Sequence, residues 1–267
     1  FGVTKKVLDV LDGAGLAYEI YSNIKANPTI ENVQTGVAAL AVSGADYIVA
    51  VGGGSSMDTA KAIGIITTNP EFADVKSLEG VAATKNPCTP IFAVPTTAGT
   101  AAEVTINYVI TDPERNCKMV CVDPHDIPVV AFVDPDMMST MPKSLTAATG
   151  MDALTHAIEA YIGSATTKAS EAEALEAVRL ISENLLPACW DGSKIEARAN
   201  MLHAAYLAGR AFSRSYVGYC HAIAHSLGGK YHIPHGLANA VLLPYVLDAY
   251  GSAIYPRAKK LAIAMHL

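Results

Sequence analysis

The stretch DYIVAVGGGSSMDTAKAIGIITT, from Asp46 to Thr68, indicates the fold of this 267-residue chain. An uninterrupted apolar run of strand length is followed by three glycines and then by a helical pattern. Uninterrupted apolar strands are typical of parallel sheets, because helices cover both faces of such a sheet. The stretch therefore predicts a strand, a tight turn and a helix within an α/β domain.

The same alternation of strands and helices extends over the first half of the chain. The other expected elements are helices at 4–14 and 29–43 and strands in LAYEIYS (16–22), PIFAVP (90–95), INYVITD (106–112), CKMVCV (117–122) and VVAFVDP (129–135). At this spacing, the pattern predicts a parallel sheet covered on both faces. We expect this α/β domain to occupy residues 1–140.

The second half of the chain is rich in alanine and helical in pattern. The expected helices are LTAATGMDALTHAIEAYIG (145–163), KASEAEALEAVRLISENLLPACW (168–190), KIEARANMLHAAYLAGRAFSRS (194–215) and HAIAHSLGGK (221–230). The turn-rich segment DPDMMSTMPKS separates the two patterns, and we place the domain boundary near Ser139 to Pro142. Residues 141–267 are therefore expected to form an all-helical domain.

Composition favours a globular protein and argues against a nucleic-acid-binding or membrane-spanning one. With 51% hydrophobic and 16% charged residues, the chain is typical of a globular protein with a sizeable core. A net charge of −6 without a basic block argues against nucleic-acid binding. The longest apolar runs are shorter than the roughly 20 residues of a membrane span. The five cysteines lack CxxC spacing, which indicates reduced thiols in the cytoplasm.

The glycine turn Gly52–Ser55 lies between a predicted buried strand and the start of a helix. Glycine lets the backbone approach a phosphate closely, and the free N–H groups and dipole of a helix start attract anions. The turn matches neither the GxGxxG pattern nor a Walker loop. A tight turn without any ligand therefore stays an alternative.

A second loop, VPTTAGTAAEVT (94–105), follows the carboxyl end of the predicted strand PIFAV. It brings the hydroxyls of Thr96, Thr97 and Thr100 to the edge at which doubly wound sheets bind ligands. The alternative is a hydroxyl-rich N-cap of a short helix. Two phosphate-compatible loops at one sheet edge favour dinucleotide binding more than either does alone.

Asp152 and His156 are four residues apart in a predicted helix, so both project from one face. That spacing suits two ligands of a single metal ion. Glu159 lies one turn beyond His156 and could orient it or form a surface pair. An ordinary pair of neighbours on a helix is the alternative for Asp152 and His156.

The stretch HAIAHSLGGKYHIPHG (221–236) holds four of the eight histidines. His221 and His225 form a second pair four residues apart, and His232 and His235 follow an expected break at Gly228-Gly229. Two helices that present such pairs can build a metal site where they pack. Spacing alone leaves open which of these histidines bind a metal.

Four motifs in this order, GGGSSMDTAKAIG, PTTAGTAAEVT, GMDALTHAIEAY and HAIAHSLGGKYHIPHGLANAVLLPY, resemble the iron-dependent (group III) alcohol dehydrogenases. The similarity is greatest to members acting on lactaldehyde and 1,2-propanediol, and it covers essentially the whole chain. It implies a Rossmann-like α/β N-terminal domain plus an all-α helical C-terminal domain, the dehydroquinate synthase-like fold.

The resemblance also implies roles for individual residues. The implied metal ligands are Asp152, His156, His221 and His235, with Fe(II) as the metal and Zn(II) as the alternative. His225 is implied as the catalytic proton-transfer residue, and Val109 and Phe212 as lining the substrate channel. The implied contacts of NAD(H) are Asn27, Gly53, Gly54, Ser55, Thr96, Thr97, Thr100, Thr105, Asn107 and Lys118.

The implied activity is a metal-dependent NAD(H) oxidoreductase of small alcohols and aldehydes, most of all lactaldehyde and 1,2-propanediol, in a cytoplasmic homodimer. Family members begin with a further βαβ element before the position of Phe1 and continue with helices after Leu267, so the chain is expected to be truncated at both ends. Two alternatives remain: glycerol dehydrogenase or cyclising-synthase chemistry with other ligands, and a non-catalytic binding or assembly module.

Overall fold

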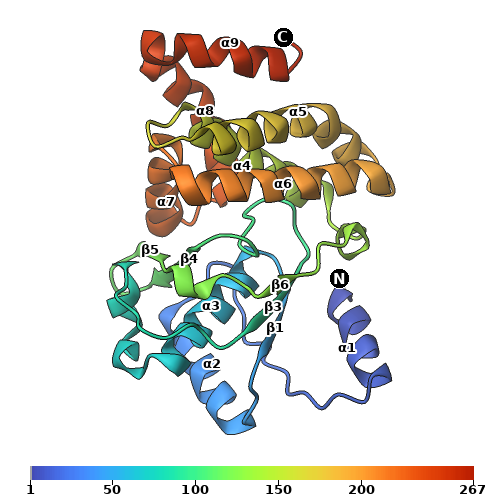
Figure 1. Cartoon of the computed structure of the whole chain (residues 1–267), viewed down its shortest axis with the longest axis vertical. Coiled ribbons are helices and arrows are strands. Elements are labelled where there is room, and N and C mark those ends of the chain that lie inside the picture. The colour runs from blue at the N-terminus through green and yellow to red at the C-terminus, as the bar shows by residue number, and fades with distance from the viewer. Residues whose placement is uncertain (1) are drawn as a thin grey trace. The chain divides into compact units, whose positions relative to one another are not determined.

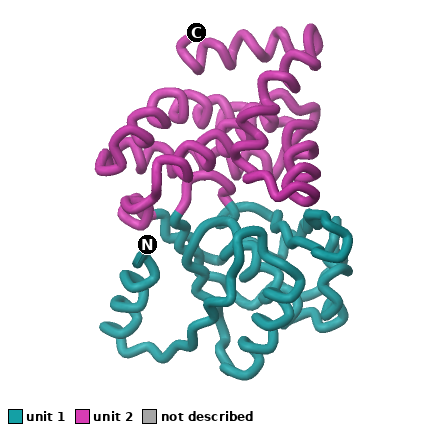
Figure 2. Tube along the Cα trace, turned by 180° about the vertical axis from the view of Figure 1, so that it is seen from behind, with its two compact units in different colours: residues 1–96, 102–133 teal, residues 97–101, 134–267 magenta. Residues whose placement is uncertain are grey.

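The computed structural model describes residues 2–267, so Phe1, where the first expected domain begins, lies outside the described residues. The chain divides into two compact units, one of residues 1–96 and 102–133 and one of residues 97–101 and 134–267 (Figure 2). The first is α/β and the second is helical, which confirms the predicted fold class (Figure 1).

The boundary between the units lies close to the one expected at residue 140. The first unit ends at residue 133, and the loop 97–101 belongs to the helical unit. Gly99 of this loop packs tightly against Thr149 in helix α4 (Lys143–Ile162), where an added Cβ would lie 2.7 Å from the Thr149 Cβ. Ala98 of the same loop is buried in the helical core, which explains why the loop belongs there.

Over its described residues, the first unit contains three α-helices and two small sheets. Its helices are α1 (Val3–Gly13), α2 (Ile30–Ser43) and α3 (Gly54–Thr68), with 3-10 turns η1 (Pro70–Phe72), η2 (Val75–Leu78) and η3 (Pro124–Asp126). Its strands are β1 (Ile48–Gly52), β2 (Gly80–Val81), β3 (Ile91–Pro95), β4 (Asn107–Asp112), β5 (Cys117–Val122) and β6 (Val130–Ala131). The sheet orders are β1-β3-β6 and β2-β5-β4.

The expectation of one parallel sheet is wrong for β4 and β5. The first sheet is parallel, but β4 pairs with β5 in the antiparallel sense, with Asn107 opposite Val122 and Asp112 opposite Cys117. Only residues 113–116 connect these strands, whereas a parallel pair needs a crossover of a dozen residues or more. The predicted strand at 129–135 is also shorter, since only Val130–Ala131 pairs.

The segment LAYEIYS (16–22), predicted as a strand, is not a strand in the structure. A cavity of about 550 Å³ is lined by residues of this segment, such as Ile20 and Tyr21, and by residues of β1, such as Ile48. Within residues 2–267, β1 pairs with β3 and no strand pairs with this segment. The Tyr21 hydroxyl instead donates to the backbone carbonyl of Asn32 in α2, at 2.6 Å.

Helix α3 forms the centre of the first unit. It packs against β1, β3 and β4 (Figure 1). It buries an unbroken run from Thr59 to Ile66. A helix that is buried over this length lies inside the unit rather than on its surface, and its polar residues Thr59 and Lys61 are buried with the apolar ones. The glycine turn at its start is therefore held by a rigid, buried element.

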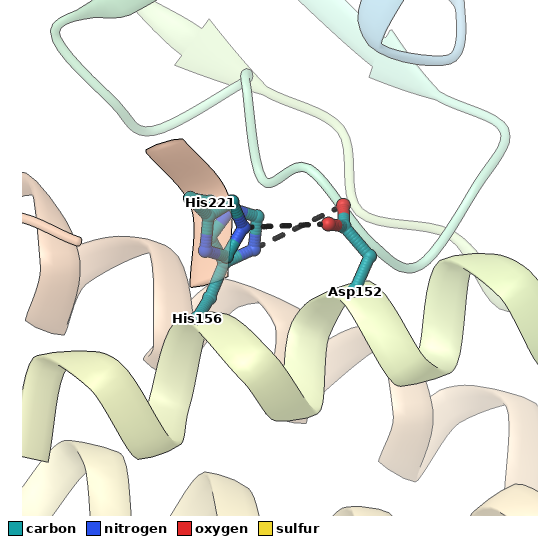
Figure 3. A group of neighbouring side chains, drawn as sticks. All are labelled: Asp152, His156 and His221. Carbon is teal, nitrogen blue, oxygen red and sulfur yellow. Dashed lines mark ion pairs between the residues drawn. The ribbon is translucent and has the colours of Figure 1, made fainter. Parts of the chain in front are cut away.

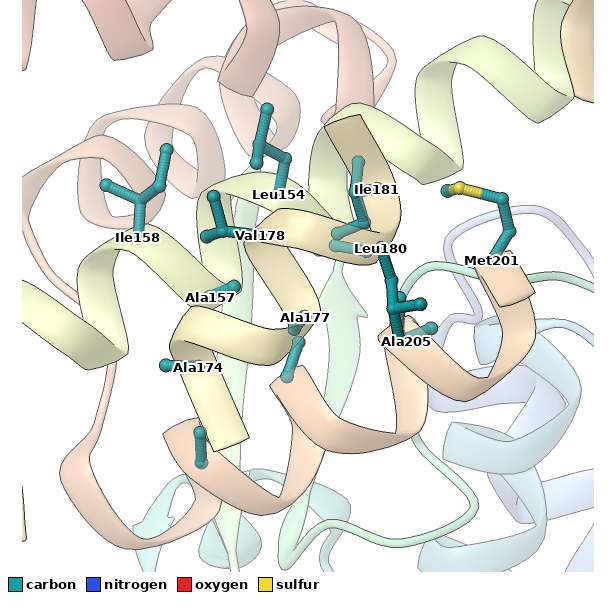
Figure 4. Close-up of a cluster of buried hydrophobic side chains, with 14 of the residues drawn as sticks. Leu154, Ala157, Ile158, Ala174, Ala177, Val178, Leu180, Ile181, Met201 and Ala205 are labelled. Carbon is teal, nitrogen blue, oxygen red and sulfur yellow. The ribbon is translucent and has the colours of Figure 1, made fainter. Parts of the chain in front are cut away.

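The second unit is a helical bundle. Its elements are the 3-10 turn η4 (Pro135–Met138), α4, α5 (Lys168–Trp190), α6 (Ile195–Ser215), α7 (Tyr219–Tyr231), α8 (His235–Tyr250), the 3-10 turn η5 (Gly251–Ile254) and α9 (Tyr255–Ala264). Helices α4, α5 and α6 pack on one another through alanines and branched side chains, among them Ala157, Ile158, Val178 and Ile181 (Figure 4). Each fully buried aliphatic side chain contributes about 1.5–3 kcal/mol to folding.

The expected break at Gly228-Gly229 is wrong. Both glycines are buried inside α7, which continues to Tyr231. The chain turns at His232, which ends the helix in the left-handed conformation with φ 56°, and Pro234 then precedes the first residue of α8. Histidine reaches this conformation less readily than glycine, so the turn was not evident from the residue types.

The run His235–Ala264 is long and apolar enough to cross a membrane by length and composition, whereas no membrane span was expected. In the structure it consists of α8, η5 and α9, and 22% of its most apolar window is buried. Gly251, with φ 50°, separates the two helices. A single run of this kind is weak evidence for a membrane segment, because core helices pass the same test.

Candidate metal centre and cofactor loops

Three of the predicted metal ligands lie together in the helical unit. Asp152 and His156 project from α4 one turn apart, and His221 faces them from α7 (Figure 3). One potential ligand atom from each residue lies within 4.8 Å of the others, and all three residues are buried. The i,i+4 spacing on α4 therefore places two side chains toward a third that comes from another helix.

The fourth predicted ligand, His235, begins helix α8 next to this group. Its Nε2 atom lies 3.3 Å from Asp152 Oδ1. The next residue, Gly236, allows the close approach of α8 to α4, because an added Cβ would lie 2.1 Å from the carbonyl oxygen of Ala148. His235 is not part of the three-residue group of potential metal ligands, but it contacts Asp152 of that group from a third helix, α8.

The remaining two histidines of the motif lie in different places. The His225 ring is half-buried, with its centroid 4.8 Å from that of His235 and 6.3 Å from that of His221. His225 therefore lies at the edge of the group. His232 is exposed and forms the turn between α7 and α8.

Glu159 contacts a different histidine from the one that the sequence suggested. It is 2% exposed, and its carboxylate accepts hydrogen bonds from the Nδ1 of His221 at 2.6 Å and from the backbone N–H of Cys220 at 2.7 Å. A carboxylate on Nδ1 fixes the imidazole orientation and leaves Nε2 to face a metal. Helical spacing could not reveal this contact, since His221 lies on a distant helix.

Asn239 is a site residue that the sequence analysis missed. It is fully buried one turn after His235 on α8, and its amide Nδ2 donates to Asp152 Oδ1 at 2.8 Å. The same Nδ2 lies 3.2 Å from His221 Nε2 and 3.3 Å from His235 Nε2. Its position four residues after His235 was the available signal, because that spacing puts both side chains on one helix face.

The protonation states within the group differ. Burial lowers the pKa of His156 to about 3. Burial alone would raise the pKa of Asp152, but the neighbouring imidazoles, His156 first, hold it well below the usual value. Burial alone would lower the pKa of His221, whereas its hydrogen bonds to Asp152 and Glu159 raise it to about 9. A metal that binds His221 would therefore displace a proton.

The residues of this group fit a divalent transition metal. Among residues 2–267, no hydrogen-bond partner is found for the buried Nδ1 of His156, which lies 4.0 Å from Asp152 Oδ2. An unsatisfied buried nitrogen costs free energy unless something else contacts it. One carboxylate with several imidazoles is a donor set that Fe(II), Zn(II) and Co(II) accept.

We expect the substitution Glu159→Gln to weaken metal binding by about ten- to a hundredfold, the usual effect of losing a carboxylate that orients a ligand. The glutamine amide would place a donor against an N–H donor, either that of Cys220 or that of His221. Titration of the metal-free chain with Zn(II) measures the change. Glu183→Gln is the matched control, because Glu183 pairs with Arg179 at the surface. Equal affinities for both variants would contradict the role of Glu159.

The glycine and threonine loops lie at the same edge of the parallel sheet. Gly52 at the end of β1 is in register with Pro95 at the end of β3, and the Thr96 N–H donates to the Gly52 carbonyl at 2.9 Å. Gly52 has φ 148°, and an added Cβ would lie 2.2 Å from Ser56 Oγ, so the turn requires glycine. The backbone N–H of Asn27 donates to Ser55 Oγ at 3.3 Å.

The other predicted cofactor and substrate residues are distributed over both units. Asn107, Val109 and Lys118 lie on the antiparallel pair β4–β5, and Thr105 lies two residues before the start of β4. Thr97 and Thr100 belong to the loop of the helical unit. Phe212 is buried in the same unit, where its ring stacks on His156 with centroids 4.3 Å apart.

Comparisons with known proteins cover both units. Residues 1–135 match the family model described as iron-containing alcohol dehydrogenase, and residues 146–267 match the C-terminal model of the Fe-containing alcohol dehydrogenase family. The chain is 55% identical to lactaldehyde reductase of Escherichia coli K12 over 246 residues, which are 92% of this chain and 64% of that protein. It is 47% identical to 1,3-propanediol dehydrogenase of Klebsiella pneumoniae over 92% of this chain and 63% of that protein.

The chain also resembles solved structures of alcohol dehydrogenases and propanediol oxidoreductases. A 1,3-propanediol oxidoreductase matches with a TM-score of 0.94 and 44% identity, over 99% of this chain and 69% of that one. The alcohol dehydrogenase from Oenococcus oeni matches with a TM-score of 0.96 and 41% identity, over 100% of this chain and 69% of that one. The chain spans 64% of the lactaldehyde reductase and 63% of the 1,3-propanediol dehydrogenase, which is slightly less than two thirds of each.

Proposed function

The chain belongs to the iron-containing alcohol dehydrogenase family, and on this premise we propose that it interconverts small primary alcohols or diols and aldehydes with NAD(H). Lactaldehyde and 1,2-propanediol are the proposed pair, because 55% identity connects the chain to a lactaldehyde reductase. The observation that carries the proposal is the buried group of Asp152, His156 and His221, with His235 beside it.

Asp152, His156, His221 and His235 are the proposed metal ligands. Fe(II) is the proposed metal, in keeping with the family, and Zn(II) suits the same donors. Once bound, such a metal supplies Lewis acidity to the oxygen of the substrate. Glu159 holds the Nδ1 of His221, and Asn239 holds Asp152 Oδ1, so both keep the ligands aimed at one point.

The proposed NAD(H) site uses the edge of the parallel sheet in the first unit. Gly53, Gly54 and Ser55 at the start of α3 present free backbone N–H groups to the pyrophosphate, and Thr96 lies beside them. Nicotinamide supplies or accepts the hydride, and the protein provides the alignment. The other contacts remain as expected from the sequence: Asn27, Thr97, Thr100, Thr105, Asn107 and Lys118.

His225 is the proposed proton-transfer residue. It is half-buried, and its ring lies 4.8 Å from that of His235 at the edge of the buried group. Imidazole gains and loses a proton near neutral pH, which suits a group that accepts the alcohol proton and returns it in the reverse direction. Val109 and Phe212 are the proposed substrate-lining residues.

A cytoplasmic homodimer is the proposed state of the protein. All five cysteines are free in the part of the chain that the structure describes, and this supports a reducing compartment. The dimer follows from the resemblance to the family.

Elemental analysis together with an NAD-dependent assay on the 267-residue chain tests the function. We expect about one Fe or Zn per chain and NADH production from (S)-1,2-propanediol, with 1,3-propanediol, methanol and glycerol as the comparison substrates. A preference for glycerol would favour the glycerol dehydrogenase alternative. A chain that binds neither metal nor NADH would contradict the proposal and favour a non-catalytic module.

A further inference from the structure

Lys61 is a lysine with no exposed surface in the centre of the first unit. It lies on α3, two turns after the glycine loop, and 0% of its side chain is exposed. Its ammonium group donates to the carbonyl oxygen of Thr105, donates to that of Asn107 at 3.1 Å, and lies 3.3 Å from Asp126 Oδ1. A lysine ammonium has three N–H donors, and three oxygens surround it here.

The two carbonyls point toward Lys61 because of the geometry of the extended chain. Successive carbonyls of an extended segment point in opposite directions. The carbonyl of Ile106, between them, accepts from the Asp123 N–H and so belongs to the β5 side. The carbonyls of Thr105 and Asn107 consequently face α3, where Lys61 is the side chain that binds both.

Lys61 stabilises the ionised form of the Asp126 carboxyl group. Its side chain is fully buried, and across residues 2–267 neither carboxylate oxygen has a hydrogen-bond partner. Burial raises its pKa to about 7, and Lys61 opposes this shift. One turn earlier on α3, the Asp58 carboxylate accepts from the Val109 backbone N–H. Two side chains of α3 therefore hold the backbone from Thr105 to Val109.

We propose that Lys61 is a positioning residue for dinucleotide binding, because it ties the Thr105–Asn107 backbone to the helix that begins at the glycine loop. A buried ammonium has a large desolvation cost that an apolar side chain would avoid. In return, it sets the position of two predicted cofactor residues relative to Gly53 and Ser55, which lie at the start of the same helix. The inference rests on the proposed NAD(H) site.

Three variants separate positioning from stability. Lys61→Met removes the carbonyl contacts and leaves Asp126 buried alone, whereas Asp126→Asn keeps the carbonyl contacts. The double variant Lys61→Met/Asp126→Asn removes both charges and avoids an isolated one. Lys76→Met is the matched control, since Lys76 pairs with Glu114 at the surface. Each is titrated with NADH by fluorescence, and thermal unfolding and amide hydrogen exchange are measured in parallel.

We expect Lys61→Met and the double variant to bind NADH about ten- to a hundredfold more weakly than the parent chain. Both variants leave the buried carbonyls of Thr105 and Asn107 without their hydrogen-bond donor, and the free-energy cost of this corresponds to such a loss of affinity. The double variant should unfold at a higher temperature than Lys61→Met, and its amides from Ile106 to Val109 should exchange faster than in the parent chain. Asp126→Asn and Lys76→Met should keep NADH affinity within about threefold.

Two results would overturn the inference while leaving the proposed function intact. In the first, the double variant binds NADH as the parent chain does. In the second, Asp126→Asn loses as much affinity as Lys61→Met, which would assign the effect to the stability of the ion pair. Failure of the parent chain itself to bind NADH is a separate outcome, and it would overturn the proposed function together with the inference.

Discussion

Replacing Asp152 by asparagine is expected to reduce metal affinity by at least about a hundredfold. Loss of a residue that only orients a ligand reduces metal affinity by up to about a hundredfold, and loss of a ligand should reduce it further. Asp152 is the carboxylate of the group, and its oxygens lie within 4.0 Å of nitrogen atoms on all three histidines, His156, His221 and His235. Asparagine keeps the size but removes the charge, and its amide would place a donor against the Asn239 donor if it faced that way. Turnover with NAD should fall with the metal content.

Elemental analysis and calorimetric titration with Zn(II) measure this effect. Asp248→Asn is the matched control, because Asp248 is exposed on α8 of the same unit. Thermal unfolding of the metal-free chains shows whether the variant is folded. If a folded Asp152→Asn chain retained its metal at the parent level, Asp152 would not be a ligand.

The second large effect is expected from Gly236→Ala. The added methyl group would lie 2.1 Å from the carbonyl oxygen and 2.6 Å from the carbonyl carbon of Ala148, which are backbone atoms of α4. Because backbone cannot turn away as a flexible side chain can, α8 must move. Overpacking of this kind costs about 1–3 kcal/mol, which lowers the midpoint of thermal unfolding by about 2–12 °C in a chain of this size.

The same displacement moves His235, the preceding residue, away from Asp152. We therefore expect Gly236→Ala to lose metal affinity as well as stability, which a substitution remote from the group would not do. Gly13→Ala is the control, since an added Cβ at Gly13 has no atom within 4 Å in the described chain. An unchanged unfolding midpoint together with unchanged metal content would show that α8 tolerates the methyl group without moving.

Local patterns predicted most of the secondary structure. The predicted helix over residues 168–190 matches α5 at both ends, because apolar spacing and the N-cap Thr167 are properties of neighbouring residues. The strand predicted at 16–22 failed for the opposite reason. A strand requires a partner at hydrogen-bonding distance, and no strand of the described residues pairs with this segment. Whether two strands pair in the parallel or the antiparallel sense depends on the length of the segment that connects them. The short turn between β4 and β5 allows only the antiparallel pairing.

Local spacing also identified only some residues of the candidate site. Sequence spacing identified the pair Asp152 and His156, since residues four apart on a helix share a face. Spacing offered His225 as the partner of His221, whereas in the structure His225 lies at the edge of the group. Glu159 was assigned to His156 or the surface, but it binds His221 across the helix interface. Asn239 was not considered, although it contacts Asp152 directly.

The sequence by itself determined the two-part architecture, the glycine turn before α3 and the acid–histidine pair on α4, because each of these depends on residues within one or two turns. Only the tertiary structure decided which distant residues meet. His221 reaches Asp152 because α7 packs beside α4, and His235 does so because Gly236 lets α8 approach the α4 backbone. Such contacts depend on how whole helices pack, a property that no local spacing encodes.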